Sequence, residues 1–394
     1  MLRRIAAVVV TLIALVAGVR LVAAPDSGVR RQLAFLRSAL DDGAAEEAQK
    51  SFPEGYFFLY ALYGLTSVDL GDEQEARWAL ARLEAPAGRA PFSPGLTPAY
   101  GVFYQGWTNW LRGGILALRP DPELRERFEA SSAALAAAFD ASPTPYLTAF
   151  PDQAWPVDST VAVASLRLHD RLLPPRYGAT VTRWLAGVRS RLDPATGLLP
   201  HTADPVTGAP GSGARGSSQS ITQRFLTDID PAFAREQYLR FRSLFVTRPL
   251  RLGPAVREYP PGVAGAGDVD SGPLMLGVSL SATTVTLGAA RVQGDEGLAR
   301  ALGNYGELLG VPVSTPWSKR YAGGLLPIGD AFLAWSKTAR PWVSPPPSPP
   351  PSLELARWWR APLLAVLALA VLLAWIPVAR VGVRRATAAP PHAG

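Results

Sequence analysis

Hydrophobic and polar positions divide the chain into two uninterrupted apolar runs near its ends and a long central region with helical periodicity. One run covers residues 5–19 behind Arg3 and Arg4, and the other covers 361–379 without a charged residue. At about 1.5 Å per residue, the second run is long enough to span a bilayer core of about 30 Å. The pattern therefore predicts a transmembrane helix at 357–380.

The first run is shorter than the second, and the small residues at 22–24 that follow it are typical of a signal-peptidase site. Segment 1–24 is thus either a cleaved signal peptide or a retained membrane anchor. Arg380, Arg384 and Arg385 follow the second run and favour a cytoplasmic tail at 381–394. We expect a membrane-anchored protein whose main domain is extracytoplasmic, in the periplasm or at the cell surface.

Apolar positions between the two runs recur with the 3.6-residue period of amphipathic helices. Some helices also have start signals: Asp230 followed by Pro231 provides an N-cap and a proline at the first helical position, and Asp158 precedes another apolar face. The pattern predicts helices at 29–49, 56–67, 72–83, 100–118, 122–139, 158–173, 178–192, 217–226, 231–245, 272–292, 296–309 and 325–338.

These twelve helices, with no convincing strand pattern among them, predict an all-α domain at 25–340. Alternating short and long connections favour an (α/α)6 toroid, in which six helical hairpins close into a ring. An α-solenoid is the alternative, although no repeat with a period near 34 residues is visible. The proline-rich segment 341–356 predicts polyproline II structure at about 3.1 Å per residue, which is typical of a semi-rigid stalk.

Composition excludes several functional classes. The net charge of +7 and the pI of about 9.8 come largely from arginines that flank the apolar runs, so a nucleic-acid partner is not expected. The absence of cysteine excludes disulfides and thiolate catalysis, and three scattered histidines do not suggest a zinc site. We expect neither a metal nor another cofactor.

A glycine-rich stretch at 257–272 lies between two predicted helices and holds several chemically active side chains. Long loops inside compact domains often carry function. Asp268 and Asp270 are two residues apart, so either one of them faces a cavity or both converge in a turn and one becomes a general acid. The alternative is that both are turn or capping residues. Pro260 stiffens the backbone beside Glu258 and Tyr259, which are either site residues or a surface charge and a buried tyrosine.

A second group of candidates surrounds Trp155. Asp152 and Asp158 flank this aromatic residue, and a glycosidase site needs a carboxylic acid, a carboxylate and an aromatic platform for a sugar ring. Alternatively, Asp158 caps the next helix and Trp155 fills the core. His201 follows a Pro/Gly turn that is expected to bring it to the rim as an acid/base group. Arg215, in a segment without the lysine of a phosphate-binding loop, is suited to gripping a substrate carboxylate.

Aromatic residues form a stripe on one predicted helix. Tyr56, Tyr60 and Tyr63 are spaced i, i+4, i+7 and therefore share a face, which either lines a funnel or belongs to the core. Asp228 and Asp230 are expected to be capping residues only.

Five motifs stand out in the central region. They are Phe-Pro-Asp-Gln-Ala-Trp-Pro-Val-Asp at 150–158, Asp-Pro-Ala-Thr-Gly-Leu-Leu-Pro-His at 193–201, Ala-Arg-Gly-Ser-Ser-Gln at 214–219, Arg-Glu-Tyr-Pro at 257–260 and Gly-Asp-Val-Asp-Ser-Gly-Pro at 267–273. Together they resemble the six-hairpin glycosidase-like superfamily, and most closely its branch of linalool dehydratase/isomerase-like proteins. The resemblance covers approximately residues 50–338 and implies an α/α toroid with a funnel on one face. That branch's known enzyme uses cysteines, which this chain lacks, so its chemistry is not carried over.

The resulting hypothesis is a membrane-anchored, extracytoplasmic glycosidase-like enzyme that acts on an envelope or secreted glycan by hydrolysis or elimination. One alternative is a linalool dehydratase/isomerase-like enzyme acting on a prenyl alcohol, and another is a non-catalytic ligand-binding or scaffold domain of the cell envelope. The predicted catalytic residues are Asp158, Asp268, Asp270, Tyr259 and His201, and the predicted substrate-binding residues are Asp152, Trp155, Arg215 and Glu258.

Overall fold

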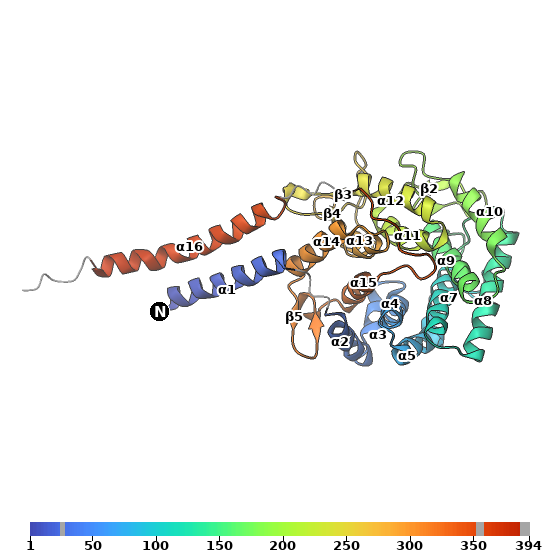
Figure 1. The fold of residues 1–394 in the computed structure, drawn as a ribbon, viewed down its shortest axis with the longest axis horizontal. Coiled ribbons are helices and arrows are strands. Elements are labelled where there is room, and N and C mark those ends of the chain that lie inside the picture. Colours follow the sequence, from blue (N-terminus) through green and yellow to red (C-terminus); the bar gives the residue numbers. More distant parts are fainter. Residues whose placement is uncertain (24–27, 352–357, 387–394) are drawn as a thin grey trace, which may run out of the picture.

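The computed structural model describes residues 1–23, 28–351 and 358–386. A helical domain occupies the centre of the chain, and the two apolar terminal helices α1 (Leu2–Val22) and α16 (Ala361–Ala386) leave it on the same side (Figure 1). Both helices are long and apolar enough to cross a membrane. Part of the predicted signal-peptidase site, part of the predicted stalk and the end of the predicted tail lie outside the described residues.

The domain consists almost entirely of helices, with three short two-stranded antiparallel ladders in its connections. The ladders are β1 (Thr202–Ala203) with β2 (Pro210–Ser212), β3 (Val246–Thr247) with β4 (Ala255–Val256), and β5 (Val313–Ser314) with β6 (Lys319–Arg320). The helices are α2 (Val29–Asp41), α3 (Ala44–Ser51), α4 (Gly55–Asp69), α5 (Glu73–Glu84), α6 (Pro86–Arg89), α7 (Gly101–Leu118), α8 (Pro122–Ala141), α9 (Pro156–Leu172), α10 (Gly178–Arg189), α11 (Gly216–Ile229), α12 (Pro231–Phe245), α13 (Leu280–Val292), α14 (Glu296–Leu309) and α15 (Pro327–Thr338), with the 3-10 turns η1 (Pro249–Arg251) and η2 (Ala322–Gly324).

Six of these helices form a closed inner ring. In order around the ring, α4, α7, α9, α11, α13 and α15 each contact the next, and α15 returns to contact α4. Helices α2, α5, α8, α10, α12 and α14 pack outside them. The fold is therefore an (α/α)6 toroid, as predicted, and the closure between α15 and α4 excludes the open solenoid.

Local sequence signals account for several helix starts. Asp121 and Asp230 accept hydrogen bonds from the backbone N–H groups three residues later, at 2.9 Å in each case, and a proline follows each of them. Two predicted boundaries were wrong. The helix expected at 29–49 is broken by Gly43, whose φ is 89°, and the helix expected at 272–292 begins only at Leu280, where Ser279 is the N-cap.

Aromatic residues fill the middle of the ring. Trp107 is almost fully buried and lies 5.3 Å from Phe225 and 5.6 Å from Trp335, measured between ring centroids. On α4, Tyr60 and Tyr63 pack instead against Trp78 of the outer helix α5, at 5.3 and 5.6 Å. The tyrosine stripe that also includes Tyr56 is thus part of the core, and the alternative that it lines a funnel was wrong.

Residues 341–351, the described part of the proline-rich segment, lie against the domain and do not project from it as a stalk. The two oxygens of the Asp228 carboxylate accept hydrogen bonds from the backbone N–H groups of Trp342, Val343 and Ser344, at 2.8–3.1 Å. The Trp342 ring stacks on Trp110, with 4.7 Å between centroids. The expectation that Asp228 only caps a helix was therefore wrong, because a buried carboxylate with several donors fixes this segment.

Candidate active site

The N-terminal ends of the six inner helices lie on one face of the ring. Each inner helix follows an antiparallel outer helix, so all six run in the same direction. Glu54 precedes α4, Trp155 precedes α9, Arg215 precedes α11, and the loop at 257–278 ends before α13. Because a helix N-terminus carries partial positive charge, this face favours negatively charged groups.

Arg215 connects most of the predicted site residues on this face. Its Nε donates to Glu258 Oε1 at 2.7 Å, and its Nη1 forms an ion pair with the Asp268 carboxylate. Its guanidinium lies 5.2 Å from the centroid of the Tyr259 ring. Burial lowers the pKa of Arg215, but the hydrogen bonds and charges of Asp268 and Glu258 raise it by more. Arg215 is therefore a fixed cation.

Glu258 joins the loop to the start of α11. Its side chain is fully buried and accepts hydrogen bonds from Ser217 N at 3.1 Å and Ser217 Oγ at 2.7 Å. Burial raises the pKa of Glu258, and the Ser217 and Arg215 contacts oppose that change. The backbone N–H of Gly216 donates to Glu258 O at 2.8 Å, and a Cβ at position 216 would lie 2.2 Å from Arg257 O. This close approach explains the glycine.

Asp268 and Tyr259 fix the conformation of the loop itself. Partial burial raises the pKa of Asp268, but the hydrogen bonds from Arg215 and from the backbone N–H of Ser271 lower it to about 2. The Tyr259 hydroxyl donates to Ala266 O at 2.9 Å within the same loop. Asp268 is consequently ionised at neutral pH, and both side chains hold the loop in place.

His201 is buried next to Arg215. Arg215 Nη1 lies 3.3 Å from His201 Nε2, and His201 Nδ1 is hydrogen-bonded to Ser218 Oγ. Because a guanidinium can only donate, Nε2 accepts and Nδ1–H donates to Ser218. Burial, and then the charge of Arg215, lower the pKa of His201 to about 4. A neutral His201 with both nitrogens engaged is suited to positioning Arg215.

Three carboxyl groups from separate parts of the chain form the feature we call the carboxyl cluster: Glu54, Asp158 and Asp270. Burial, and then the charge of Asp270, raise the pKa of Glu54 to about 7. Burial, and then Glu54 and Asp270, raise the pKa of Asp158 well above its ordinary 3.8. Within the described ranges, none of the three forms an ion pair. The cluster therefore retains protons at pH values where isolated carboxyl groups lose them.

The structure also excludes the capping alternatives for two members of this cluster. Helix α9 begins at Pro156, so Asp158 lies in its first turn, 5 % exposed, and is not the N-cap. Ser279 caps α13, so Asp270 does not. Asp270 lies in an exposed part of the loop. Burial of its carboxyl group and the charge of Asp268 raise its pKa, and the charge of Arg215 opposes them.

Trp155 and Asp152 lie beside the start of α9. Trp155 is half-buried, with its ring perpendicular to that of Phe150 and 5.9 Å between centroids. Asp152 is exposed in the turn at 150–153 and has a φ of 58°. Their roles as a sugar platform and a substrate contact stay predictions.

Glu54 is the cluster member that the sequence analysis missed. It lies between Pro53 and Gly55, directly before the apolar helix α4. An acidic residue at the start of an inner helix is the signal that also marked Asp158. Recognising it requires knowing that α4 and α9 begin on the same face.

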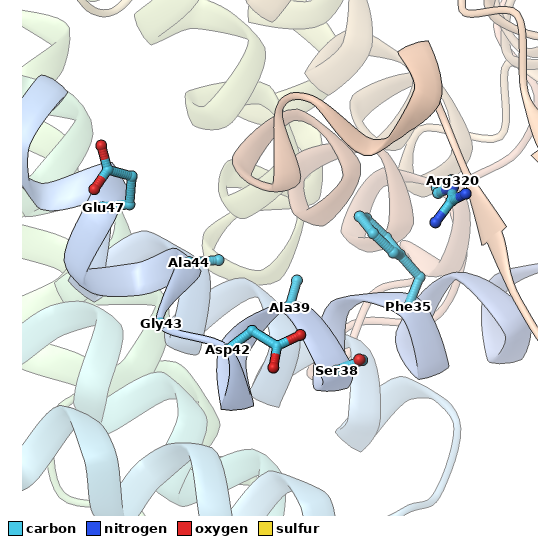
Figure 2. Close-up of a pocket in the computed structure, with 8 residues that line it drawn as sticks. All are labelled: Phe35, Ser38, Ala39, Asp42, Gly43, Ala44, Glu47 and Arg320. Atoms are coloured by element: carbon cyan, nitrogen blue, oxygen red, sulfur yellow. The ribbon is translucent and has the colours of Figure 1, made fainter.

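A cleft of about 500 Å³ lies elsewhere on the domain (Figure 2). Figure 2 shows Glu47 at one end of the cleft and Phe35 and Arg320 at the other. None of its lining residues belongs to the carboxyl cluster or contacts Arg215. The lining residues are Phe35, Ser38, Ala39, Asp42, Gly43, Ala44, Glu47 and Arg320.

Comparison with known proteins gives little further information. No protein-family model matches the chain. Among solved structures, the domain is similar to the GH76 α-mannanase BT2949 of Bacteroides thetaiotaomicron, with a TM-score of 0.48 and 10 % sequence identity. The match covers 79 % of this chain and 97 % of the mannanase.

Proposed function

We propose that this protein is a membrane-anchored glycosidase-like enzyme that uses the carboxyl cluster for acid/base hydrolysis of an envelope or secreted glycan. One observation carries the proposal. Glu54, Asp158 and Asp270 come from three separate segments, and none of them forms an ion pair within the described residues. Burial and the charge of Asp270 raise the pKa of Glu54, and burial and the charges of Glu54 and Asp270 raise the pKa of Asp158. Maintaining such a cluster costs stability, which is typical of catalytic sites.

The three carboxyl groups have different environments and therefore different proposed roles. Glu54, with a pKa of about 7, is protonated in a large fraction of molecules at neutral pH and donates a proton to the leaving glycosidic oxygen. Asp270 lies on the exposed loop; burial of its carboxyl group and the charge of Asp268 raise its pKa, and the charge of Arg215 opposes them. As the exposed member of the cluster, Asp270 has the proposed role of the ionised group that activates water. Burial, and then the charges of Glu54 and Asp270, raise the pKa of Asp158 well above 3.8, so Asp158 is the member proposed to keep its proton during the reaction.

The loop that carries Asp270 is held in place by a group of supporting residues. These residues are Arg215, Glu258, Asp268, Tyr259 and His201. Trp155, half-buried beside the start of α9, is the proposed platform for a sugar ring. Asp152 lies next to it as a proposed substrate contact. The exposed position of Asp270 does not suit the closed apolar pocket that a prenyl alcohol requires.

We propose that α1 and α16 anchor the enzyme in the membrane, with the toroid on the extracytoplasmic side. The positive-inside rule, applied to the arginines after position 379, supports this orientation. Cleavage of the toroid by external protease in intact spheroplasts tests it. Protection of the toroid until the membrane is permeabilised contradicts it.

The enzymatic proposal is tested by measuring new reducing ends when the purified full chain, in detergent, is incubated with a panel of oligosaccharides and polysaccharides. We expect Glu54→Gln and Asp270→Asn each to lower kcat/KM about 100-fold or more. The control Asp42→Asn, in the separate cleft, leaves the rate unchanged. Wild-type activity should decline as the pH rises through about 7, because Glu54 loses its proton.

Three results would change the proposal. Activity that survives both Glu54→Gln and Asp270→Asn contradicts the role of the carboxyl cluster. Products with an unsaturated sugar at one new end, and with no oxygen from water at the new reducing end, indicate elimination. Glycan binding by the wild-type chain without turnover of any bound glycan favours the ligand-binding alternative.

A further inference from the structure

Exposed apolar side chains gather where the terminal helices leave the domain. The connection between α14 and α15 contains the β5–β6 hairpin, in which Val311, Val313 and Trp317 are 61 %, 44 % and 79 % exposed. The hairpin lies beside the domain end of α1 (Figure 1). Exposed large apolar residues concentrated in one short segment indicate a contact surface.

The hairpin is an ordered structure. β5 pairs with β6 in antiparallel register, and Thr315 N donates to Ser318 O at 2.8 Å across the turn. Thr315 Oγ1 also accepts from the backbone N–H groups of Trp317 at 3.3 Å and Ser318 at 2.9 Å. Pro316 and Trp317 are therefore held at the tip of the hairpin. Because the tip is already ordered, a contact made by these residues costs little conformational entropy.

Hydrogen bonds fix this region to the end of α1. Arg20 Nη2 donates to Pro312 O at 2.9 Å, directly before β5. Asn304 Nδ2 donates to the backbone oxygens of Arg20 and Ala23, at 3.0 and 2.6 Å. Arg360 Nε donates to Leu21 O at 2.9 Å. Side chains of the domain thus act as partners for the carbonyl groups that the end of α1 leaves without helical hydrogen bonds. The same contacts fix the position of the hairpin along the axis of α1.

A second exposed segment lies near the start of α16. Leu250, in the turn η1, is 74 % exposed, and Trp358 is 77 % exposed. Gly253, just beyond this turn, approaches Trp359 so closely that an added Cβ would lie 3.4 Å from its ring. The turn therefore belongs to the same end of the domain as the first residues of α16.

Within these two segments the charged residues are all basic. Segments 246–257 and 308–329 contain no aspartate or glutamate, whereas they and the end of α1 contribute several arginines. Basic residues interspersed with exposed tryptophan and aliphatic residues suit the headgroup region of an anionic bilayer. The arginines are Arg20, Arg248, Arg251, Arg257 and Arg320.

We propose that the β5–β6 hairpin and the turn η1 rest in the headgroup region of the same bilayer that holds α1 and α16. This proposal rests on the proposed membrane anchoring of the two helices. It implies that the toroid sits directly on the membrane surface with a fixed orientation. The described part of the proline-rich segment, which ends at residue 351, agrees with this arrangement. It packs against the domain and therefore does not act as a long spacer between the toroid and α16.

The absence of native cysteine permits a direct test. Single cysteines are introduced into the full chain by Val313→Cys in β5 and by Leu369→Cys in α16, and each is labelled with an environment-sensitive fluorophore. Val206→Cys, in the exposed turn between β1 and β2 on the far side of the domain, is the matched control (Figure 1). The proteins are reconstituted into anionic nanodiscs that contain spin-labelled lipids.

We expect lipids with a spin label near the headgroup to quench the fluorophore at Val313→Cys, with a blue shift relative to detergent. The fluorophore at Val206→Cys should show neither change, and lipids labelled in the acyl chain should quench Leu369→Cys. Adding Trp317→Ser to Val313→Cys should reduce the quenching. Quenching at Leu369→Cys without quenching at Val313→Cys overturns the docking proposal but preserves the anchoring. Loss of quenching at Leu369→Cys overturns the anchoring itself.

Discussion

Replacing Glu54 with glutamine tests the carboxyl cluster without knowledge of the substrate. In the folded protein, burial and the charge of Asp270 raise the pKa of Glu54 from an ordinary 4.5 to about 7. The folded state therefore binds one more proton than the unfolded state between these two pH values. The proton on Glu54 therefore contributes to the free energy of unfolding. This contribution is complete below about pH 4.5 and is lost as the pH rises to about 7. Glutamine mimics the protonated form and does not ionise.

The difference between 4.5 and about 7 is equivalent to about 3.4 kcal/mol between the protonated and ionised states of Glu54. This value is an upper limit, because Glu54 is only partly buried and Asp270 takes up protons of its own. We expect Glu54→Gln to be about 1–2 kcal/mol more stable than the wild-type chain at pH 8 and equal to it near pH 4. The corresponding rise in Tm at pH 8 is a few degrees, at about 2–4 °C per kcal/mol.

Thermal unfolding of the full chain in detergent, followed by circular dichroism between pH 4 and 8, measures this difference. Glu126→Gln, at an exposed position of α8, is the matched control and should change Tm equally at every pH. A Tm difference between Glu54→Gln and wild type that does not vary with pH refutes the reasoning. So does a variant that is less stable than wild type at pH 8.

Two further predictions concern the surroundings of the site and the opposite end of the ring. Gly216→Ala should lower the free energy of unfolding by about 2 kcal/mol or more, because the added Cβ would lie 2.2 Å from Arg257 O. Chemical denaturation measures this difference. Gly178→Ala is the control and should be neutral in that assay, because the space around its Cβ is open. Asp228→Asn should loosen the segment at 341–351, because the amide nitrogen replaces one of the two acceptor oxygens that hold Trp342. Limited proteolysis should therefore cut this segment faster than in the wild-type chain. An unchanged rate of cleavage contradicts the role of Asp228 in holding the segment.

The sequence predicted much of the fold because each helix of the toroid carries its own signals. Apolar periodicity located the helices, and Asp230 with Pro231 marked a boundary that the structure reproduces. The boundary at 272–279 was missed because Gly272 and Gly277 adopt φ values of 66° and 76°, which end the helical pattern only in the folded loop. The packing of residues 341–351 against the domain was missed, because their contacts with Asp228 are nonlocal.

The candidate site was predictable only in part. The loop at 257–272 pointed to Glu258 and Asp268, and proximity in the sequence was enough to associate them. Glu54 lies more than 200 residues from Asp270. Only closure of the ring between α15 and α4 places the start of α4 near this loop, and closure is not encoded in any one segment.

The supporting residues also determine how a pH profile of the enzyme should be interpreted. Asp268 Oδ1 accepts hydrogen bonds from the backbone N–H groups of Asp270 and Ser271, each at 3.1 Å, while its other oxygen pairs with Arg215. The pKa of Asp268 is about 2, so this anchor stays ionised while Glu54 titrates near 7. The position of Asp270 is therefore constant over that range. A change in activity near pH 7 therefore reports a proton within the carboxyl cluster and not an opening of the loop.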